Sequence, residues 1–218
     1  MEYMVHGSLY DVLHDDSIVL KPEQMLAILQ DVASGLRFLH SATPQVVHGD
    51  LKAQNVLIDA NFCAKVTDFG LSGKKQLGAV GTPYWMSPEL LCGEGVNTAA
   101  SDIYAFGMVM YELYSGRAPY AGEVYAEVVQ QICSPTIRKR PQIPLHCPAK
   151  VAKIMSDCFE HDPSLRPTAE QLDLALKVEL KVKERTSRLE SLNRELEKAN
   201  QKIASASAMQ LQHFACMS

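Results

Sequence analysis

The stretch VVHGDLKAQNVLID at residues 46–59, followed by AKVTDFG at residues 64–70, decides the fold that we expect of this chain. It sets three polar side chains at fixed offsets, with Asn55 five residues after Asp50 and Asp68 eighteen residues after Asp50. Moving a phosphoryl group requires a carboxylate that orients and deprotonates a hydroxyl, and oxygen ligands that hold Mg²⁺ on the phosphates. The pattern therefore predicts a phosphoryl-transfer site. The alternative is that these polar groups only cap loops and turns.

The sequence around this stretch predicts a mainly α (α+β) domain with one small β-hairpin. VLID at 56–59 and AKVTD at 64–68 have the composition of short strands, and the four residues between them favour a hairpin. Residues 22–40 carry an apolar stripe at helical spacing, and Pro22 suits a first helical turn. Residues 100–115 are apolar almost all round, which is typical of a buried helix. Further helices are expected at 122–133, 148–158 and 168–178.

Three more motifs follow along the chain: GTPYWMSPE at 81–89, SDIYAFGMVMYEL at 101–113 and DPSLRPT at 162–168. With these motifs and the stretch above, residues 1–176 resemble the C-terminal lobe of a eukaryotic-type Ser/Thr protein kinase of the tyrosine-kinase-like group. The resemblance implies that Asp102 is the buried helix aspartate that supports the catalytic loop. It also implies that Arg166 pairs with Glu89.

The resemblance implies a role for each residue of the site. Asp50 is the expected catalytic base, and Lys52 is expected to contact the transferred phosphate, where negative charge develops. Asn55 and Asp68 are expected to bind Mg²⁺, and Thr82 is expected to help seat the protein substrate. Lys52 together with the sequence GTPYW favours Ser or Thr over Tyr as the acceptor. The cofactors implied are ATP and Mg²⁺.

The start of the chain resembles the segment that links the two lobes of a kinase, because M-E-Y-M is followed two residues later by G-S-L. Backbone groups of Glu2 and Met4 are then expected to face the adenine of ATP. Ser8 or Asp11 is expected to reach the ribose, and Leu57 is expected to pack under the base. The alternative is that the opening residues are only an N-terminal tail.

One departure from the family pattern lies in the catalytic loop, where Gly49 stands in place of the usual arginine. That arginine normally meets a phosphorylated activation segment through charge-assisted hydrogen bonds. Residues 73–81 contain no Ser, Thr or Tyr. We therefore expect activity that does not require phosphorylation within 73–81.

A second departure is that these 218 residues contain neither a glycine-rich strand-loop-strand nor the V-A-I-K lysine with its helix glutamate. In kinases, those parts of the N-terminal lobe cover the ATP phosphates. We expect the chain to be a fragment that starts at an internal methionine, binds ATP weakly and shows little kinase activity as written.

The C-terminal segment 177–218 differs in composition, because all glycines and prolines lie at or before Pro167. Its charge-rich sequence favours a helix. Apolar residues recur at spacings of three and four, with Arg185 as the charged exception, which predicts a two-stranded parallel coiled coil and a homodimer through residues 182–206. The alternative is a single solvated helix or one packed on the kinase lobe. The seam consists of Val182, Arg185, Leu189, Leu192, Leu196, Ala199, Ile203 and Ala206.

The last nine residues, QLQHFACMS at 210–218, carry a second resemblance. They are similar to the run that precedes the histidine motif in the dimerisation helix of sensor histidine kinases. This similarity implies a parent protein in which a histidine kinase module follows the Ser/Thr kinase-like domain.

The composition argues against several classes of protein. Lys and Arg number 21 against 25 Asp and Glu, a net charge of −4, so we expect no nucleic-acid partner. No apolar run approaches the roughly 20 residues that span a bilayer, and the start is not a signal peptide. The six cysteines show neither a C-x-x-C pair nor zinc spacing, so we expect reduced cysteines, no structural metal and a cytoplasmic location. Membrane attachment of the parent outside this segment stays open.

Two functions from different classes are compatible with these features. The first is transfer of phosphate from ATP to Ser or Thr of protein substrates in signalling. The second is a non-catalytic kinase-homology domain that acts as a regulatory or dimerisation module. The presence of Asp50, Lys52, Asn55 and Asp68 favours the enzyme, because degenerate relatives usually lose at least one of these residues.

Overall fold

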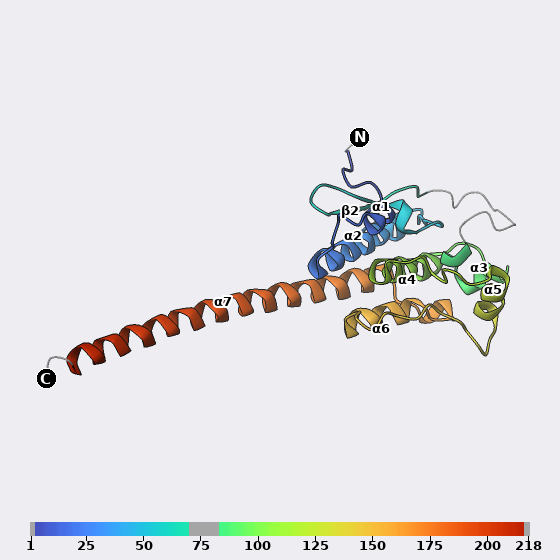
Figure 1. Cartoon of the computed structure of the whole chain (residues 1–218). Helices are drawn as coiled ribbons and strands as arrows, with labels where there is room; N and C mark the ends of the chain where they lie inside the picture. The colour runs from blue at the N-terminus through green and yellow to red at the C-terminus, as the bar shows by residue number, and fades with distance from the viewer. Residues whose placement is uncertain (1–2, 70–82, 216–218) are drawn as a thin grey trace. The chain divides into compact units, whose positions relative to one another are not determined.

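The computed structural model describes residues 3–69 and 83–215, with side chains up to residue 202. The chain divides into two units, Met1–Lys177 and Val178–Ser218. In chain order, with η denoting a 3₁₀ helix, the elements of the described residues are α1 (Leu9–His14), α2 (Pro22–Ser41), η1 (Ala53–Asn55), β1 (Val56–Ile58), β2 (Ala64–Val66), η3 (Pro83–Trp85), α3 (Pro88–Leu91), α4 (Ala99–Ser115), α5 (Tyr125–Cys133), α6 (Ala149–Cys158), η4 (Pro163–Leu165) and α7 (Ala169–Ala215) (Figure 1).

Helix α4 forms the centre of the first unit and is buried along most of its length, as its apolar sequence predicts. It packs against α6 and against α2. The approach to α6 is close at Gly107, where an added Cβ would lie 2.8 Å from a ring carbon of Phe159 and 2.9 Å from Cβ of Cys158. A glycine inside a helix costs stability in isolation, and here it allows the two helices to meet.

The predicted hairpin is confirmed. Strands β1 and β2 pair antiparallel with Val56 opposite Val66. Helix α2 covers β2, and an added Cβ on Gly35 would lie 3.1 Å from a methyl group of Val66. The hairpin is therefore fixed on the helical layer, and its open end carries residues of the predicted site, because Asn55 directly precedes β1 and Asp68 follows β2.

The expected fold class, mainly helical with one small sheet, is confirmed, and so are the five predicted helices. Helix α1 was not predicted; Ser8 is its N-cap and forms a capping box with Asp11. Leu9 and Val12 of this helix are buried. Its six residues are too few for a helical period to be visible in the sequence.

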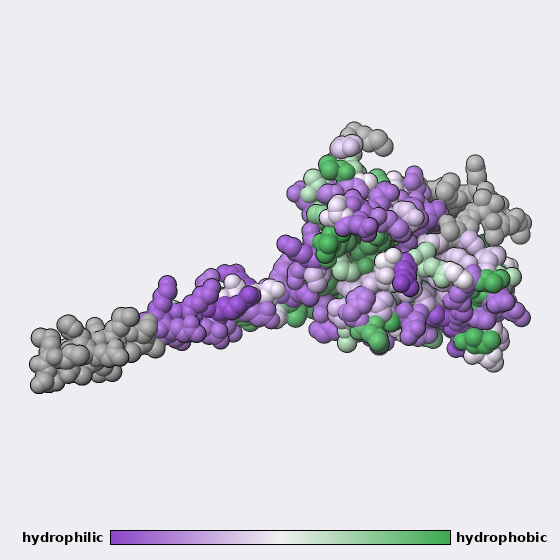
Figure 2. All heavy atoms as spheres, viewed as in Figure 1, coloured by the Kyte–Doolittle hydropathy of each residue, from purple (hydrophilic) through white to green (hydrophobic). Residues whose placement is uncertain are grey.

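The predicted helix at 168–178 and the helix predicted for the C-terminal segment form one continuous helix, α7, up to Ala215, so the expected long C-terminal helix is confirmed. The reason is compositional, because the sequence after Pro167 holds neither a glycine to cap a helix nor a proline to stop one. Within the second unit, the side chains of Leu189, Leu192 and Leu196 are 61 %, 51 % and 59 % exposed. Hydrophilic side chains dominate the visible face of this unit in Figure 2.

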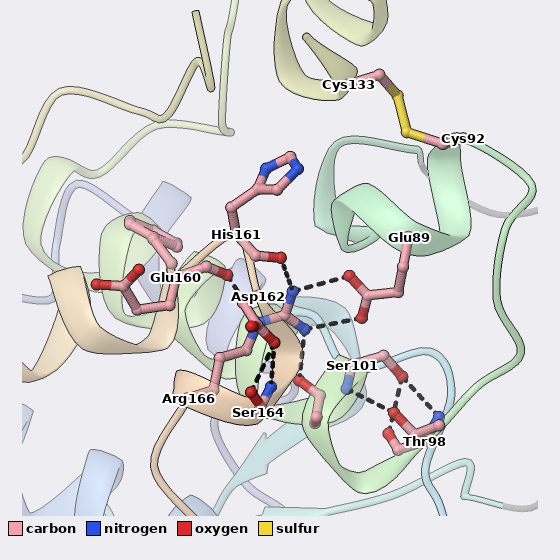
Figure 3. A network of polar contacts seen from close by, with 12 residues as sticks. Glu89, Cys92, Thr98, Ser101, Cys133, Glu160, His161, Asp162, Ser164 and Arg166 are labelled. Carbon is pink, nitrogen blue, oxygen red and sulfur yellow. Dashed lines mark hydrogen bonds and ion pairs between the residues drawn. A yellow bond between two sulfur atoms is a disulfide. The ribbon is translucent and has the colours of Figure 1, made fainter. Parts of the chain in front are cut away.

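The expectation of reduced cysteines is wrong for one pair. The structure joins Cys92, directly after α3, to Cys133 at the end of α5, with a Cα–Cα distance of 6.0 Å (Figure 3). The two residues lie 41 positions apart with α4 between them. No local cysteine spacing could have indicated this pairing, because the fold alone brings α3 and α5 together.

Among the residues that the structure describes, no helix combines the length and the apolar character that crossing a bilayer requires.

Candidate active site

Asp102 of α4 holds the loop that carries the predicted base through hydrogen bonds. Its side chain is buried, with 1 % of its surface exposed. Its Oδ2 accepts a hydrogen bond from the backbone N–H of His48, and its Oδ1 accepts one from the backbone N–H of Gly49, both at 2.8 Å. The imidazole Nε2 of His40 also lies 2.8 Å from Oδ2. A buried carboxylate is costly without such partners. Asp102 therefore supports the catalytic loop, as the resemblance implies.

Gly49 adopts φ +78°, a left-handed backbone that favours glycine, and an added Cβ would lie 3.0 Å from the side-chain nitrogen of Asn97. The glycine that replaces the usual arginine is therefore also the residue that this loop geometry accepts most easily.

Asp50, Lys52 and Asn55 form one hydrogen-bonded group. The ammonium of Lys52 lies 2.8 Å from Oδ2 of Asp50. The side-chain nitrogen of Asn55 donates to the backbone carbonyl of Asp50 at 2.7 Å and to its Oδ2 at 3.1 Å. Asn55 is buried at the end of η1, whereas the side chain of Asp50 is 29 % exposed. Two side-chain donors thus orient the carboxylate of Asp50 through Oδ2, and the carboxylate remains partly exposed.

Asp68 is held next to this group through its neighbour in the chain. The backbone N–H of Thr67 donates to the carbonyl of Asn55 at 3.0 Å, and the ring Nε2 of His48 lies 2.9 Å from the carbonyl of Thr67. Asp68 itself is exposed and has φ +57°. A left-handed backbone is uncommon for a residue with a side chain and is found at functional sites.

The donor atoms of the site suit a hard cation. Both hydrogen bonds of the Asn55 side chain use its nitrogen, so its oxygen remains as a ligand, and the exposed carboxylate of Asp68 is the second oxygen donor. Such oxygens are what Mg²⁺ prefers, and Mg²⁺ commonly takes only one or two protein ligands together with phosphate oxygens. Within the described ranges, no group of three or more His, Cys, Asp or Glu side chains could hold a metal ion. The arrangement therefore fits a cation shared with a phosphate ligand.

The segment that carries the predicted nucleotide residues lies along β1. The N–H of His6 donates to the carbonyl of Ile58 at 3.2 Å, and the N–H of Ile58 donates to the carbonyl of Gly7 at 2.8 Å. A bridge pairs Ser8 with Leu57. The structure thus brings the segment around residues 4–8 beside Leu57. Glu2 lies outside the described residues.

Ser8 and Asp11 have a role that the sequence analysis did not assign, because they cap α1. The Ser8 hydroxyl donates to Oδ2 of Asp11 at 2.6 Å, and the Ser8 N–H donates to the same oxygen at 2.8 Å. These bonds, led by that from the hydroxyl, lower the pKa of Asp11. Ribose binding by either residue stays a prediction, and it would compete with the cap.

The expected pair of Glu89 and Arg166 is present and bidentate. Two guanidinium nitrogens of Arg166 donate to the two carboxylate oxygens of Glu89, each at 2.8 Å (Figure 3). Arg166, with a side chain that is 0 % exposed, also donates to the carbonyls of Glu160 and Ala100 at 2.9 Å. Burial raises the pKa of Glu89, but the hydrogen bonds and charge of Arg166 together with further hydrogen bonds outweigh burial, so the net shift of this pKa is downward. This pair fixes α3 to the segment before α7.

Glu112 is a residue that the sequence analysis missed. Its Oε2 accepts a hydrogen bond from the indole Nε1 of Trp85 at 2.7 Å and one from the N–H of Ala53 at 3.2 Å. It therefore joins the end of η3 to the catalytic loop. Burial raises its pKa to about 7 against the opposing effect of these bonds. The signal in the sequence was a lone glutamate in an otherwise apolar helix, which needs partners when buried.

Thr82 and the segment 73–81 lie outside the described residues. The expected substrate contact of Thr82 and the expected independence from phosphorylation within that segment therefore stay predictions. The side chains of 210–218 are likewise outside the description, and the similarity to histidine kinases stays a prediction too.

Comparison with known proteins agrees with this geometry. The family model described as protein tyrosine and serine/threonine kinase matches residues 1–176. The chain is 39 % identical over 174 residues to the probable serine/threonine-protein kinase drkA of Dictyostelium discoideum, covering 78 % of this chain and 27 % of the relative. It is 38 % identical over 185 residues to drkB of the same organism, covering 83 % and 26 %. It is also 38 % identical over 172 residues to the dual specificity protein kinase pyk3 of that organism, covering 77 % and 12 %.

The chain thus spans about a quarter of the length of the first two curated relatives. The match to the family model covers residues 1–176, which include Arg166, and ends within helix α7.

Proposed function

This chain belongs to the protein tyrosine and serine/threonine kinase family, and we propose that it provides the catalytic loop of an enzyme that transfers the terminal phosphate of ATP to Ser or Thr of signalling proteins. The observation that carries the proposal is the bonded group of Asp50, Lys52 and Asn55. Asp68 is tied to the same group through the Thr67–Asn55 backbone hydrogen bond.

In this proposal, Asp50 orients the acceptor hydroxyl and takes its proton. Its Oδ2 is engaged by Lys52 and Asn55, so Oδ1 is the oxygen that these contacts leave for the hydroxyl. The ammonium of Lys52 lies close enough to stabilise the negative charge that develops on the transferred group. Because the loop is fixed by Asp102, the carboxylate is held in position before the substrate arrives.

Asn55 and Asp68 would hold Mg²⁺, through the amide oxygen of the first and the carboxylate of the second. When bound, Mg²⁺ supplies positive charge that neutralises the phosphates. On the nucleotide side, backbone groups around Met4 would contact adenine, and Leu57 would pack on the base. Ser8 and Asp11 remain candidates for the ribose, and Thr82 remains the candidate for seating the protein substrate.

Ser or Thr is the proposed acceptor because Lys52 follows Asp50 by two residues and the sequence GTPYW precedes α3. The names of the first two relatives, both probable serine/threonine-protein kinases, support the same assignment. The relative named as a dual specificity kinase makes acceptor identity a necessary part of the test.

We also propose that the protein forms a homodimer through residues 182–206 of α7. The exposed leucines at 189, 192 and 196 support this, because they repeat at spacings of three and four. Covering such a seam with a second copy removes apolar surface from water.

The test of the transfer function uses the full-length gene product, incubated with a Ser/Thr-rich protein substrate, Mg²⁺ and ATP labelled on its terminal phosphate. We expect label on phosphoserine or phosphothreonine, and its loss when Mg²⁺ is chelated. Label on phosphotyrosine alone would contradict the proposed acceptor. A well-folded protein that transfers no label would favour the alternative, a regulatory kinase-homology domain.

A further inference from the structure

The disulfide Cys92–Cys133 joins the residue directly after α3 to the last residue of α5. Figure 3 shows Glu89 on α3 and Cys92 at the C-terminal end of this helix, with Glu89 directed to Arg166 and Cys92 directed to Cys133. Both cysteines are partly exposed. The bond therefore joins the helix that the ion pair fixes to a helix that otherwise contacts it only through packing.

Helix α5 is weakly anchored apart from this bond. Of its nine residues, only Val128 and Ile132 are buried. Two polar contacts with Lys139 are added at Gln131, where the Lys139 ammonium donates to Oε1 at 2.9 Å and the Lys139 backbone N–H donates to the carbonyl at 3.1 Å. A short helix with so few buried side chains is expected to open locally more easily than the core helices.

The other end of α5 meets the segment that leads into α3. The ring of Tyr84 in η3 lies 5.9 Å from the ring of Tyr125, the first residue of α5, and 5.8 Å from the ring of Tyr120. With the disulfide at the far end, α5 is held at both ends against the η3–α3 segment. In the proposed function, this segment follows Thr82, the residue expected to seat the protein substrate.

The remaining described cysteines differ in their surroundings. Cys147 and Cys158 are buried and burial raises the pKa of both, that of Cys147 to about 11. A buried thiol with a raised pKa reacts slowly, because the thiolate is the nucleophile. Cys63 is exposed and has no cysteine partner among the residues that the structure describes. Cys92 and Cys133 thus form the pair that combines partial exposure with a partner in reach.

We propose that Cys92 and Cys133 are a reversible redox modification site that controls how firmly α5 is held and hence how well protein substrates dock beside α3. The effect on docking rests on the proposed kinase function, whereas the effect on α5 does not. Oxidation fastens α5 in the observed position. Reduction leaves it held by the tyrosine contacts, by the Gln131–Lys139 hydrogen bonds and by two buried side chains.

Hydrogen peroxide is the proposed oxidant. One thiolate attacks a peroxide oxygen and becomes a sulfenic acid, and the other oxygen leaves as hydroxide, which takes a proton to give water. The second thiol then displaces water from the sulfenic acid and the S–S bond forms. In the reverse direction a dithiol reductant gives up two electrons and two protons, restores both cysteine thiols and becomes a disulfide itself.

The test measures thiol state and backbone protection in the full-length gene product. After peroxide, mass spectrometry of unreduced digests is expected to show the Cys92–Cys133 peptide pair, and after dithiothreitol both cysteines are expected to be alkylated. Amide exchange in 125–133 should be roughly tenfold faster after reduction, while exchange in 103–110 of α4 should not change. The Cys133→Ser variant should show the fast exchange in both conditions, and the Cys63→Ser variant should behave as the unsubstituted protein.

If both cysteines alkylate after peroxide, or if exchange in 125–133 is the same in both states, the redox site is refuted. The comparison of the oxidised and the reduced unsubstituted protein decides the test even where the Cys133→Ser variant fails to fold. Where transfer activity is present, reduction should raise KM for a protein substrate roughly threefold to tenfold and change kcat by less than about twofold. An unchanged KM would refute the docking effect, and absence of transfer in both states would count against the kinase function and not against the redox site.

Discussion

At the scale of single residues, the segments around the site are held by buried charged side chains that form ion pairs or hydrogen bonds, such as Asp102 and Arg166. Arg166 is fully covered and gives hydrogen bonds to Glu89 and to backbone carbonyls. A buried ion pair adds little net stability compared with apolar residues, but breaking it by removing one partner leaves an uncompensated charge. The pair is therefore expected to be sensitive to a change on either side.

Replacing Glu89 by Gln should lower the free energy of unfolding by about 3 kcal/mol, because the buried Arg166 loses its counter-charge. Urea unfolding followed by tryptophan fluorescence measures this loss. The matched control is Asp157→Asn, which removes an exposed i,i+4 pair with Lys153 and should cost less than about 0.5 kcal/mol. Equal costs for the two variants would show that the Glu89–Arg166 pair does not behave as a buried one.

Glu112 predicts a pH dependence of stability. Its folded pKa of about 7 is above the ordinary value of 4.5, so the folded state holds the proton more tightly than the unfolded state. Stability from this group is then complete below pH 4.5 and is lost as pH rises toward 7, by about 3 kcal/mol in total. The measurement is the difference in unfolding free energy between the native protein and Glu112→Gln from pH 5 to pH 8. A difference that does not change with pH would contradict a raised pKa.

At the scale of elements, the packing of α4 on α6 depends on Gly107. An added Cβ would lie under 3 Å from both Phe159 and Cys158, and overpacking of this kind typically costs about 1–3 kcal/mol. Gly107→Ala should therefore destabilise the fold despite the better helix propensity of alanine. In α2, Gly35→Ala meets only a methyl group of Val66 at 3.1 Å, so its cost should be smaller. Thermal unfolding of both variants tests this order, and the reverse order would contradict the described approach of α4 and α6.

The elements also show which parts of the fold could be predicted from the sequence. The period of apolar residues was sufficient for α2 and α4, and the strand pair around residues 56–66 followed from two short apolar runs. Helix α1 was missed because a six-residue helix depends on its cap and on burial against distant residues. The long C-terminal helix was predicted from the charge-rich composition after Pro167, and its continuity with the helix expected at 168–178 follows because no glycine or proline interrupts it.

The same limit applies to the candidate site. Asp50, Asn55 and Asp68 were predicted from local spacing, and the partners of Asp102 and Arg166 from family resemblance. The Trp85–Glu112 bond and the Cys92–Cys133 bond were not predicted, since each joins residues that only the tertiary fold brings together.

At the scale of the whole molecule, the dimer proposal predicts the effect of a charge in the seam of α7. Leu192→Glu should convert a dimer to a monomer in sedimentation analysis, because two carboxylates would face each other in an apolar core. The control is Ser191→Glu, one position off the seam, which should leave the dimer intact. If the unsubstituted protein sediments as a monomer, or if both variants remain dimers, the seam is not the dimer interface.

The central claim, that the carboxylate of Asp50 acts as the base in phosphoryl transfer, is tested most directly by the rate of phosphate transfer in the Asp50→Asn variant of the full-length gene product. Asparagine keeps the size of the side chain and an oxygen that can accept hydrogen bonds from Lys52 and Asn55, but it carries no negative charge and cannot take a proton. We predict a loss in kcat of roughly 100-fold or more, whereas Asp16→Asn, which changes an exposed carboxylate, should leave the rate unchanged. An Asp50→Asn variant that retains its rate within a few-fold would contradict the account.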